Sequence, residues 1–231
     1  MDNLSRLSVI KALIKHKHLK NYLEIGVFNG HVFFRVPSFS KVAVDPEFRF
    51  DGWRKLGKDL VNPSNLFNKY FEVTSDDFFA SEAPRLYASK KIQLALVDGM
   101  HQYDYALRDV ENTLKFATGD VAIILHDCNP ATKQAASTFE EWESNNFSYQ
   151  WNGDVWKAIV HLRSLRKDLT SFVLDADFGL GIVVRKTNER PLRFSADQIR
   201  DLTYDELNKN RKEWLGLQPP SYFFDFFGIK P

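Results

Sequence analysis

The sequence predicts an α/β protein with a doubly wound, mostly parallel sheet that ends in an antiparallel hairpin. Short apolar segments alternate with helix-patterned segments over residues 20–166, which is typical of parallel strands joined by crossover helices. Two later strands, at 170–174 and 181–184, are separated by too few residues for a crossover helix. The composition, 44% hydrophobic and 26% charged in 231 residues, is typical of a globular protein with a sizeable core.

The size favours a single domain over residues 1–231, with an N-terminal helix (1–19) and a helical, aromatic C-terminal extension (187–231) packed on it. The longest apolar run, at 121–125, is far shorter than the roughly 20 residues of a membrane helix. The net charge of +1 indicates no nucleic-acid-binding surface. A single cysteine, Cys128, cannot form an internal disulfide, which fits a reducing compartment, so we expect a cytoplasmic protein. The short apolar runs and the small net charge lead us to expect no membrane or nucleic-acid partner.

Each element is expected from its hydrophobic period and from the turn residues beside it. The first half predicts a helix over 3–17, strands at 22–25 and 41–44, a weak helix over 52–62, a strand at 70–73, and a short helix capped by Ser75, Asp76 and Asp77. The second half predicts a strand at 92–97, a helix over 106–114, a turn at Gly119–Asp120, a strand at 121–125, helices over 131–143 and 155–166, the hairpin, and a helix capped by Thr203 and Glu206.

Ligands of such sheets bind where the parallel strands end, so the residues after each strand are the first candidates. The first strand runs into Glu24-x-Gly26-x-x-x-Gly30, a spacing that does not fit the dinucleotide pattern and disfavours a nicotinamide dehydrogenase. Gly26 would let a ligand approach the backbone, and Gly30 would let the next helix pack closely. Asp45, after the second strand, can accept both hydroxyl protons of a ribose. A tight ligand-free turn, with Asp45 as a turn residue, is the alternative.

The fourth and fifth strands end in Asp98 and in His126-Asp127. If these strands are neighbours, Asp98 and Asp127 can bridge Mg²⁺ or a similar hard cation. His101, three residues after Asp98, is a candidate general base, with a solvent-exposed helix end as the alternative. Because neighbouring strand residues point to opposite faces, His126 is expected to turn away from the site that Asp127 faces.

These residues resemble class I S-adenosylmethionine-dependent methyltransferases. The run from Leu23 through Gly30, followed by Val44-Asp45, is similar to the cofactor loop and ribose-binding acid of that family. Residues 96–103 (LVDGMHQY), 125–127 (LHD) and 151–157 (WNGDVWK) resemble a subgroup related to the macrocin-type sugar O-methyltransferases. The resemblance covers about residues 20–186 and implies a seven-stranded Rossmann-like sheet with the last two strands as the hairpin.

The resemblance also implies roles for single residues. The implied cofactor contacts are Glu24, Gly26, Asn29 and Gly30 at the methionine end, Asp45 at the ribose, Ser75 and Asp76 beside the adenine, and Asp98. Related metal-dependent O-methyltransferases hold a divalent cation where Asp98 and Asp127 stand, and His101 takes the position of the base, so Asp98 and His101 are the implied catalytic residues. Many relatives read Asp-Gly-Asp-His, whereas here Met100 replaces the second acid.

The leading hypothesis is therefore an S-adenosylmethionine-dependent O-methyltransferase acting on a sugar or another small hydroxylated substrate. The alternatives are a metal-independent methyltransferase on another small molecule, and a cofactor-binding module without catalysis. The aromatic tail at 222–227 leaves three alternatives: it docks on its own core, forms a homodimer contact, or lines the acceptor pocket.

Overall fold

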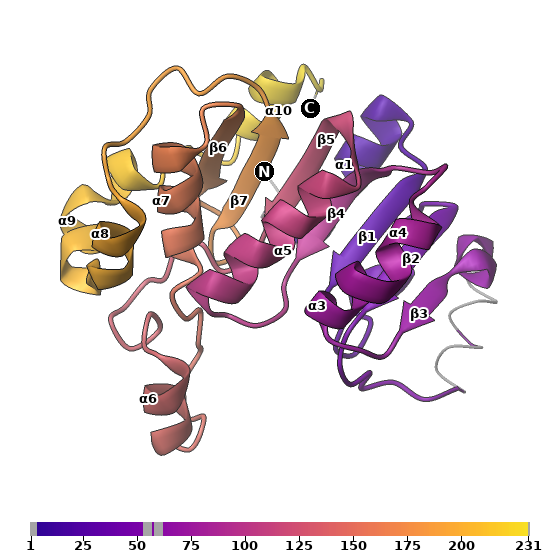
Figure 1. The fold of residues 1–231 in the computed structure, drawn as a ribbon, viewed down its shortest axis with the longest axis horizontal. Helices are drawn as coiled ribbons and strands as arrows, with labels where there is room; N and C mark the ends of the chain where they lie inside the picture. Colours follow the sequence, from indigo (N-terminus) through magenta and orange to yellow (C-terminus); the bar gives the residue numbers. More distant parts are fainter. Residues whose placement is uncertain (1–3, 53–56, 58–61, 231) are drawn as a thin grey trace. The chain divides into compact units, whose positions relative to one another are not determined.

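The strands of the computed structural model form a seven-stranded sheet in the order β3-β2-β1-β4-β5-β7-β6 (Figure 1). The structure describes residues 4–52, 57 and 62–230. The strands are β1 (Asn21–Ile25), β2 (Ser40–Val44), β3 (Lys69–Phe71), β4 (Ile92–Val97), β5 (Ala117–Leu125), β6 (Leu169–Leu174) and β7 (Leu180–Arg185). This architecture confirms the predicted fold class, a mostly parallel sheet that ends in an antiparallel hairpin.

The chain divides into two compact units, which are described separately. The first, called the N-terminal unit, comprises Ser5–Gly99 and Asp109–Val121. In it β1 pairs in parallel with β2 and β4, and β2 pairs in parallel with β3. Residues 94–96 of β4 are fully buried, as expected for a central strand that is covered on both faces.

The second, called the C-terminal unit, comprises Met100–Arg108 and Ala122–Pro231. Here β7 pairs antiparallel with β5 and with β6. Leu125, the last residue of β5, lies opposite Gly181, near the start of β7. Arg185, the last residue of β7, lies opposite Leu169, the first residue of β6. The two ends of β7 therefore belong to different surfaces of this unit.

Helices begin where the side chain of a polar residue satisfies free backbone N–H groups. Capping boxes start α1 at Ser5 and, as predicted, α9 at Thr203 with Glu206. The helical elements are α1 (Arg6–Lys17), η1 (Phe33–Arg35), η2 (Pro63–Phe67), α3 (Ser75–Asp77), η3 (Phe78–Glu82), α4 (Ala83–Leu86), α5 (Tyr103–Lys115), α6 (Phe139–Ser144), α7 (Trp156–Leu165), α8 (Ala196–Asp201), α9 (Tyr204–Trp214) and α10 (Tyr222–Phe227). The C-terminal extension is helical, as expected.

Two local predictions in the N-terminal unit were wrong. The cap of the short helix is Thr74, whose hydroxyl accepts the N–H of Asp77, so Ser75 is a residue of the first turn. The expected turn at Gly119–Asp120 belongs to β5, and the chain turns instead at Phe116, whose N–H donates to Thr113 O. The carbonyl of Phe116 accepts the N–H of Ile92. Pairing with β4 therefore begins before Gly119, and β5 starts at Ala117. Most of the helix predicted over 52–62 lies outside the described residues.

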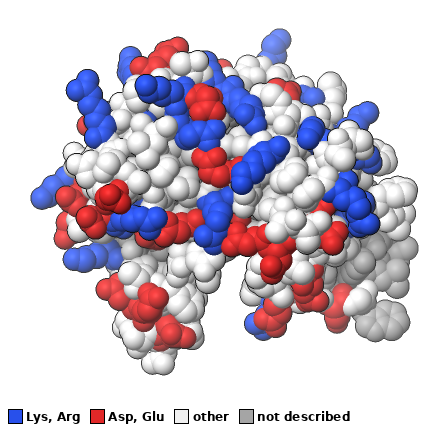
Figure 2. All heavy atoms as spheres, viewed as in Figure 1, with Lys and Arg blue, Asp and Glu red and all other residues white. Residues whose placement is uncertain are grey.

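The helix predicted over 131–143 is also wrong in its first half. Residues 131–136 form turns, and α6 begins only after Thr138, which shares a capping box with Glu141. A hydroxyl that caps a new helix competes with helix continuation at the same point. In Figure 1, α6 projects away from β6 and β7 of its own unit. Figure 2 shows acidic side chains on this lobe, where α6 carries Glu140, Glu141 and Glu143.

The aromatic tail forms α10 and packs on its own unit. Phe223 is fully buried, and the rings of Tyr222 and Phe226 lie 5.2 Å and 4.8 Å from that of Phe172 on β6, both in edge-to-face geometry. This is the first of the three alternatives for the tail. Among the described residues, no helix has the length and apolar character needed to cross a membrane.

Candidate active site

The loop after β1 makes a tight turn for which Gly26 is required. Its φ of +81° lies in the left-handed region, and a Cβ at this position would overlap the carbonyl of Asp98. The Gly26 N–H donates to Val44 O at 2.9 Å, so the turn lies directly at the end of β2. Gly30, at φ +72°, is approached by the ring of Phe34 in η1, so the close packing expected there involves a short 3₁₀ turn.

Asp45 braces this loop from the end of β2. The side chain is 8% exposed; Oδ2 accepts the N–H of Phe28 at 2.7 Å, and Oδ1 accepts the N–H of Glu47 at 2.9 Å. A carboxylate has about four acceptor positions, so these two bonds leave capacity for two ribose hydroxyls. The bracing role is new, because spacing in the sequence did not indicate which loop N–H the acid would accept.

The remaining predicted cofactor residues of the N-terminal unit lie in turns. Asn29 Oδ1 accepts the N–H of His31 at 2.9 Å and closes the loop locally. Ser75 and Asp76, in the first turn after β3, are both partly exposed. Asp98, directly after β4, lies 3.3 Å from Nε of Arg6, the first residue of α1. The Arg6 contact was missed, since nothing in the sequence pattern links α1 to the strand ends.

Glu24 is nearly fully buried within β1, beneath the loop. The hydroxyl of Tyr22 donates to its Oε2 at 2.5 Å. Burial raises the pKa of Glu24 to about 8, because the carboxylate loses its hydration; the Tyr22 hydrogen bond and the charges of Lys41 and Arg6 oppose this only in part. Near neutral pH the carboxyl is therefore largely protonated in the folded protein, whereas in the unfolded chain it is ionised.

We expect Glu24→Gln to raise the free energy of unfolding at pH 7 by on the order of 2–3 kcal/mol. The wild-type fold keeps the proton between the unfolded pKa of 4.5 and the folded pKa of about 8, so stability falls as pH rises through this window. The variant should lose that fall in urea titrations across the window. Glu47→Gln, at an exposed site, is the control, and an unchanged pH slope in Glu24→Gln would contradict the buried-acid assignment.

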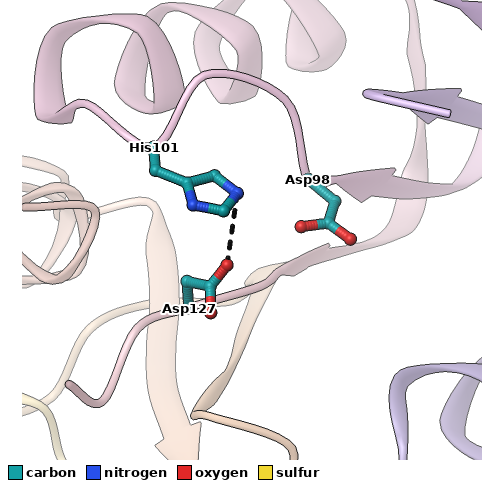
Figure 3. Close-up of side chains that lie close together, drawn as sticks. All are labelled: Asp98, His101 and Asp127. Atoms are coloured by element: carbon teal, nitrogen blue, oxygen red, sulfur yellow. Dashed lines mark ion pairs between the residues drawn. The ribbon is translucent and has the colours of Figure 1, made fainter. Parts of the chain in front are cut away.

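In the C-terminal unit, His101 and Asp127 face each other (Figure 3). His101 Nε2 lies 3.2 Å from Asp127 Oδ2, and Nδ1 lies 3.1 Å from the carbonyl oxygen of Trp151. A carbonyl only accepts, so Nδ1 carries the proton and donates it. In the neutral ring, Nε2 then presents a lone pair toward a carboxylate, an arrangement stabilised by a shared proton or a cation.

Asp127 departs from the strand geometry that the prediction for His126 assumed. Its φ is +60°, two residues beyond the end of β5, and this turn directs both neighbouring side chains toward each other. His126 Nδ1 lies 2.9 Å from Asp127 Oδ2, so the prediction that His126 turns away was wrong. Its Nε2 lies 3.4 Å from Asp177 Oδ1. A ring with a carboxylate at each nitrogen is best satisfied as an imidazolium.

Residues 151–154, called the WNGD segment, fix both sides of this pair. Trp151 contacts His101 twice: its carbonyl accepts the Nδ1 proton, and its ring stacks on the imidazole with the centroids 5.2 Å apart. Asn152 Nδ2 donates to Asp127 Oδ1 at 2.5 Å. Gly153, at φ +63°, fits against the His101 carbonyl where a Cβ would overlap, and Asp154 Oδ1 accepts the N–H of Tyr103 at 2.6 Å. This stretch resembles the sugar O-methyltransferase subgroup in sequence, but its residue pattern alone indicated no role for it.

Asp98 lies in the N-terminal unit, whereas His101 and Asp127 lie in the C-terminal unit. The residue types predicted for the cation, carboxylates beside an imidazole, suit Mn²⁺ or Mg²⁺. Within the C-terminal unit, His101 and Asp127 supply an imidazole and a carboxylate that face each other.

A family model described as a methyltransferase domain matches residues 23–128. Over these residues the chain is similar to a methyltransferase domain. The matched range begins in β1 and ends just after Asp127, so it contains Gly26, Asp45, Asp98 and His101. None of the curated proteins matches the chain.

Solved structures share the fold at low sequence identity. An O-methyltransferase from Bacillus cereus in complex with SAH is 13% identical, with a TM-score of 0.52 over 80% of this chain and 83% of its own. Cofactor-bound Rv0187 from MTB is 10% identical, with a TM-score of 0.58 over 81% and 83%. TomG from Streptomyces achromogenes, an O-methyltransferase involved in tomaymycin synthesis and solved with SAM, is 12% identical, with a TM-score of 0.55 over 78% and 79%. These similarities confirm the fold.

Proposed function

We propose that the protein transfers the methyl group of S-adenosylmethionine to a hydroxyl of a small molecule, with residues 1–231 working as one domain. The observation that carries the proposal is the His101–Asp127 pair, because a base with an oriented lone pair serves an oxygen nucleophile. A hydroxyl is a poor nucleophile until its proton is removed, whereas an amine or thiol needs less help. The fold, the match to a methyltransferase-domain family and the two O-methyltransferases among the solved structures that share the fold support this reaction class.

The cofactor supplies a sulfonium methyl group that is already activated for transfer. In the proposal, Gly26, Asn29 and Gly30 shape the loop that holds its methionine end, with Glu24 beneath, and Asp45 binds the ribose. Ser75 and Asp76 lie beside the adenine, and Asp98 completes the site at the end of β4. The task left to the chain is to align the acceptor oxygen with the methyl group and to exclude water.

His101 is the proposed base. Its Nδ1 proton is held by the Trp151 carbonyl, so Nε2 is the nitrogen that takes the acceptor proton. Once protonated, Nε2–H faces Asp127, whose orientation is fixed by Asn152 and His126. The charge that forms on the ring is therefore met by a carboxylate already in place, as catalysis by preorganised electrostatics requires.

A cavity of about 260 Å³ beside His101 is the proposed acceptor site. Its lining includes Tyr103, Trp151, Lys157 and Arg200, so most of its groups can bind hydroxyl oxygens. Both faces of the Trp151 ring are covered, one stacked on Trp142 at 4.7 Å and one on His101, so Trp151 is not a free stacking platform. The polar lining supports a sugar or a similar hydroxylated acceptor. We further propose a cytoplasmic location, with homodimerisation to be tested by sedimentation.

The decisive experiment incubates the protein with methyl-labelled S-adenosylmethionine and a panel of monosaccharides, nucleotide sugars, catechols and amines. Label recovered as a methyl ether of a hydroxylated compound supports the proposal, and label on an amine supports a different methyltransferase. Titration calorimetry with S-adenosylmethionine and NAD runs in parallel. Cofactor binding without transfer to any acceptor would favour a binding module that lacks catalysis.

Asp45→Ala is expected to weaken S-adenosylmethionine binding by about 1.5–3 kcal/mol, the range for losing hydrogen bonds to a charged group. The loss combines the ribose contacts with the release of the Phe28 N–H from its acceptor. Titration calorimetry measures the affinity. Glu47→Ala is the control, because its side chain is exposed and pairs with Arg49. Unchanged affinity in a folded Asp45→Ala protein would remove Asp45 from the cofactor site.

If Asp98 and Asp127 hold a divalent cation, a chelator should lower activity at least about tenfold, and Mn²⁺ or Mg²⁺ should restore it. Mn²⁺ binding, followed by electron paramagnetic resonance, should weaken in Asp127→Asn. Full activity in chelator, together with no Mn²⁺ signal, would leave His101 working alone. Arg6, already beside Asp98, would then supply the positive charge at that carboxylate.

A further inference from the structure

A cavity of the C-terminal unit lies away from the His101–Asp127 pair. Its volume is about 550 Å³, and it opens beside the first residues of β6 and the segment after β7, including Ser171 and Lys186. The His101–Asp127 pair follows the end of β5, which lies opposite the start of β7. The two sites are thus at opposite ends of β7, and a ligand in this cavity would occupy a second site.

Arg163, on α7, gives the cavity a half-buried positive charge. Its Nη1 donates to Ser171 O at 2.7 Å and its Nη2 to Glu213 O at 3.4 Å, both backbone carbonyls. Among the described residues, no carboxylate lies within ion-pair distance of this guanidinium, and its Nε is buried without a hydrogen-bond partner. Burial lowers the pKa of Arg163. Two backbone carbonyls accept its hydrogen bonds, and the Glu213 carboxylate acts on it only from beyond ion-pair distance, so the guanidinium can still attract an anion.

Ser171 adds a second polar group that lacks a partner. The residue is 2% exposed, lines the cavity, and its hydroxyl makes no hydrogen bond within the described part of the chain. The hydroxyl is buried behind the cavity surface, so Ser171 acts on the cavity through its carbonyl oxygen, which holds Nη1 of Arg163. The cavity lining also carries Lys186, Arg190 and Lys212 against only two carboxylates, those of Glu189 and Glu213.

The opposite wall is aromatic. Phe172, Tyr222 and Phe226 all line the cavity, and their rings contact one another at 4.8–5.8 Å between centroids. Lys186 Nζ lies 5.7 Å from the centroid of Phe226, so the lysine ammonium group adjoins the aromatic wall. The lining therefore fits a molecule with a charged end and a flat apolar body.

We propose that this cavity is a second binding site, for a small organic anion in which a phosphate or carboxylate is joined to an aromatic or other apolar ring. The oxyanion accepts from Arg163, and Lys186, Arg190 and Lys212 surround it. The ring lies against Phe172 and the α10 aromatics. The site does not depend on the proposed methyl transfer, because none of its residues belongs to the cofactor loop or to the His101–Asp127 pair.

The test is titration calorimetry of the full-length protein with phenyl phosphate, benzoate and inorganic phosphate, at roughly 150 mM salt to screen surface charges. Phenyl phosphate or benzoate should bind with a Kd of about 1 mM or tighter, and inorganic phosphate at least tenfold more weakly, because it lacks the ring. The better of the two ring compounds identifies the oxyanion. No binding by either ring compound up to about 10 mM would overturn the proposal.

Matched variants locate the site. Arg163→Gln and Lys212→Gln should each weaken binding of the ring compound, Arg163→Gln at least tenfold and Lys212→Gln about threefold. Their controls are Arg166→Gln, whose side chain pairs with Asp168, and Lys209→Gln on the same helix as Lys212; neither residue lines the cavity. Lys212→Gln keeps the test valid if Arg163→Gln does not fold. Equal losses in variants and controls, or loss in His101→Ala, would place the anion elsewhere and overturn the proposal.

Discussion

His101→Ala is expected to lower kcat about 10²–10⁴-fold while the affinity for S-adenosylmethionine stays nearly unchanged. The ring is held by the Trp151 carbonyl at Nδ1 and faces Asp127 through Nε2, so it is oriented to take one proton. Removing it leaves the acceptor hydroxyl without a base, whereas the cofactor loop belongs to other residues. Steady-state kinetics with the identified acceptor measures kcat, and titration calorimetry measures the affinity for S-adenosylmethionine.

His16→Ala is the matched control for this prediction, because His16 is exposed on α1. His126 cannot serve as a control, since it bridges Asp127 and Asp177, and His126→Ala should also reduce activity by releasing Asp127. A full loss at His126 with little change at His101 would mean that the base is the other histidine. Unchanged kcat in both variants would remove the pair from the reaction.

Gly26→Ala is expected to destabilise the protein by about 2–4 kcal/mol and to abolish measurable cofactor binding. The residue has a φ of +81°, and its new methyl group would overlap the backbone of Asp98 and Gly99. Because the overlap is with backbone atoms, no side-chain rotation can relieve it. The loop must then move away from the ends of β2 and β4. Urea unfolding and calorimetric titration with S-adenosylmethionine measure the two effects.

Gly99→Ala is the control for Gly26→Ala. A Cβ at Gly99 would lie 3.5 Å from Ile25 Cγ2, an ordinary van der Waals contact, so its stability should change by less than about 1 kcal/mol. Similar losses in the two variants would show that the region tolerates no added methyl group, and would contradict a specific requirement at Gly26.

Several site residues could be predicted because they sit next to features that the sequence encodes locally. Gly26 and Asp45 follow strands whose ends are marked by turn residues, and the Phe28 N–H joins the loop of Gly26 to Asp45 at the end of β2. His101 and Asp127 were each placed after a strand and are in contact. The prediction for His126 failed because it extended strand alternation past Leu125, whereas the chain turns there with a positive φ at Asp127.

The sequence by itself determined the order of helices and strands, the antiparallel hairpin and the position of the loop after β1, because hydrophobic period and turn residues act over a few neighbours. Only the tertiary structure decided which residues meet. Arg6 reaches Asp98, Trp151 orients a histidine 50 residues earlier, and Arg163 donates to two backbone carbonyls beside a cavity. Such contacts depend on how whole elements pack, and no local pattern in the chain encodes that packing.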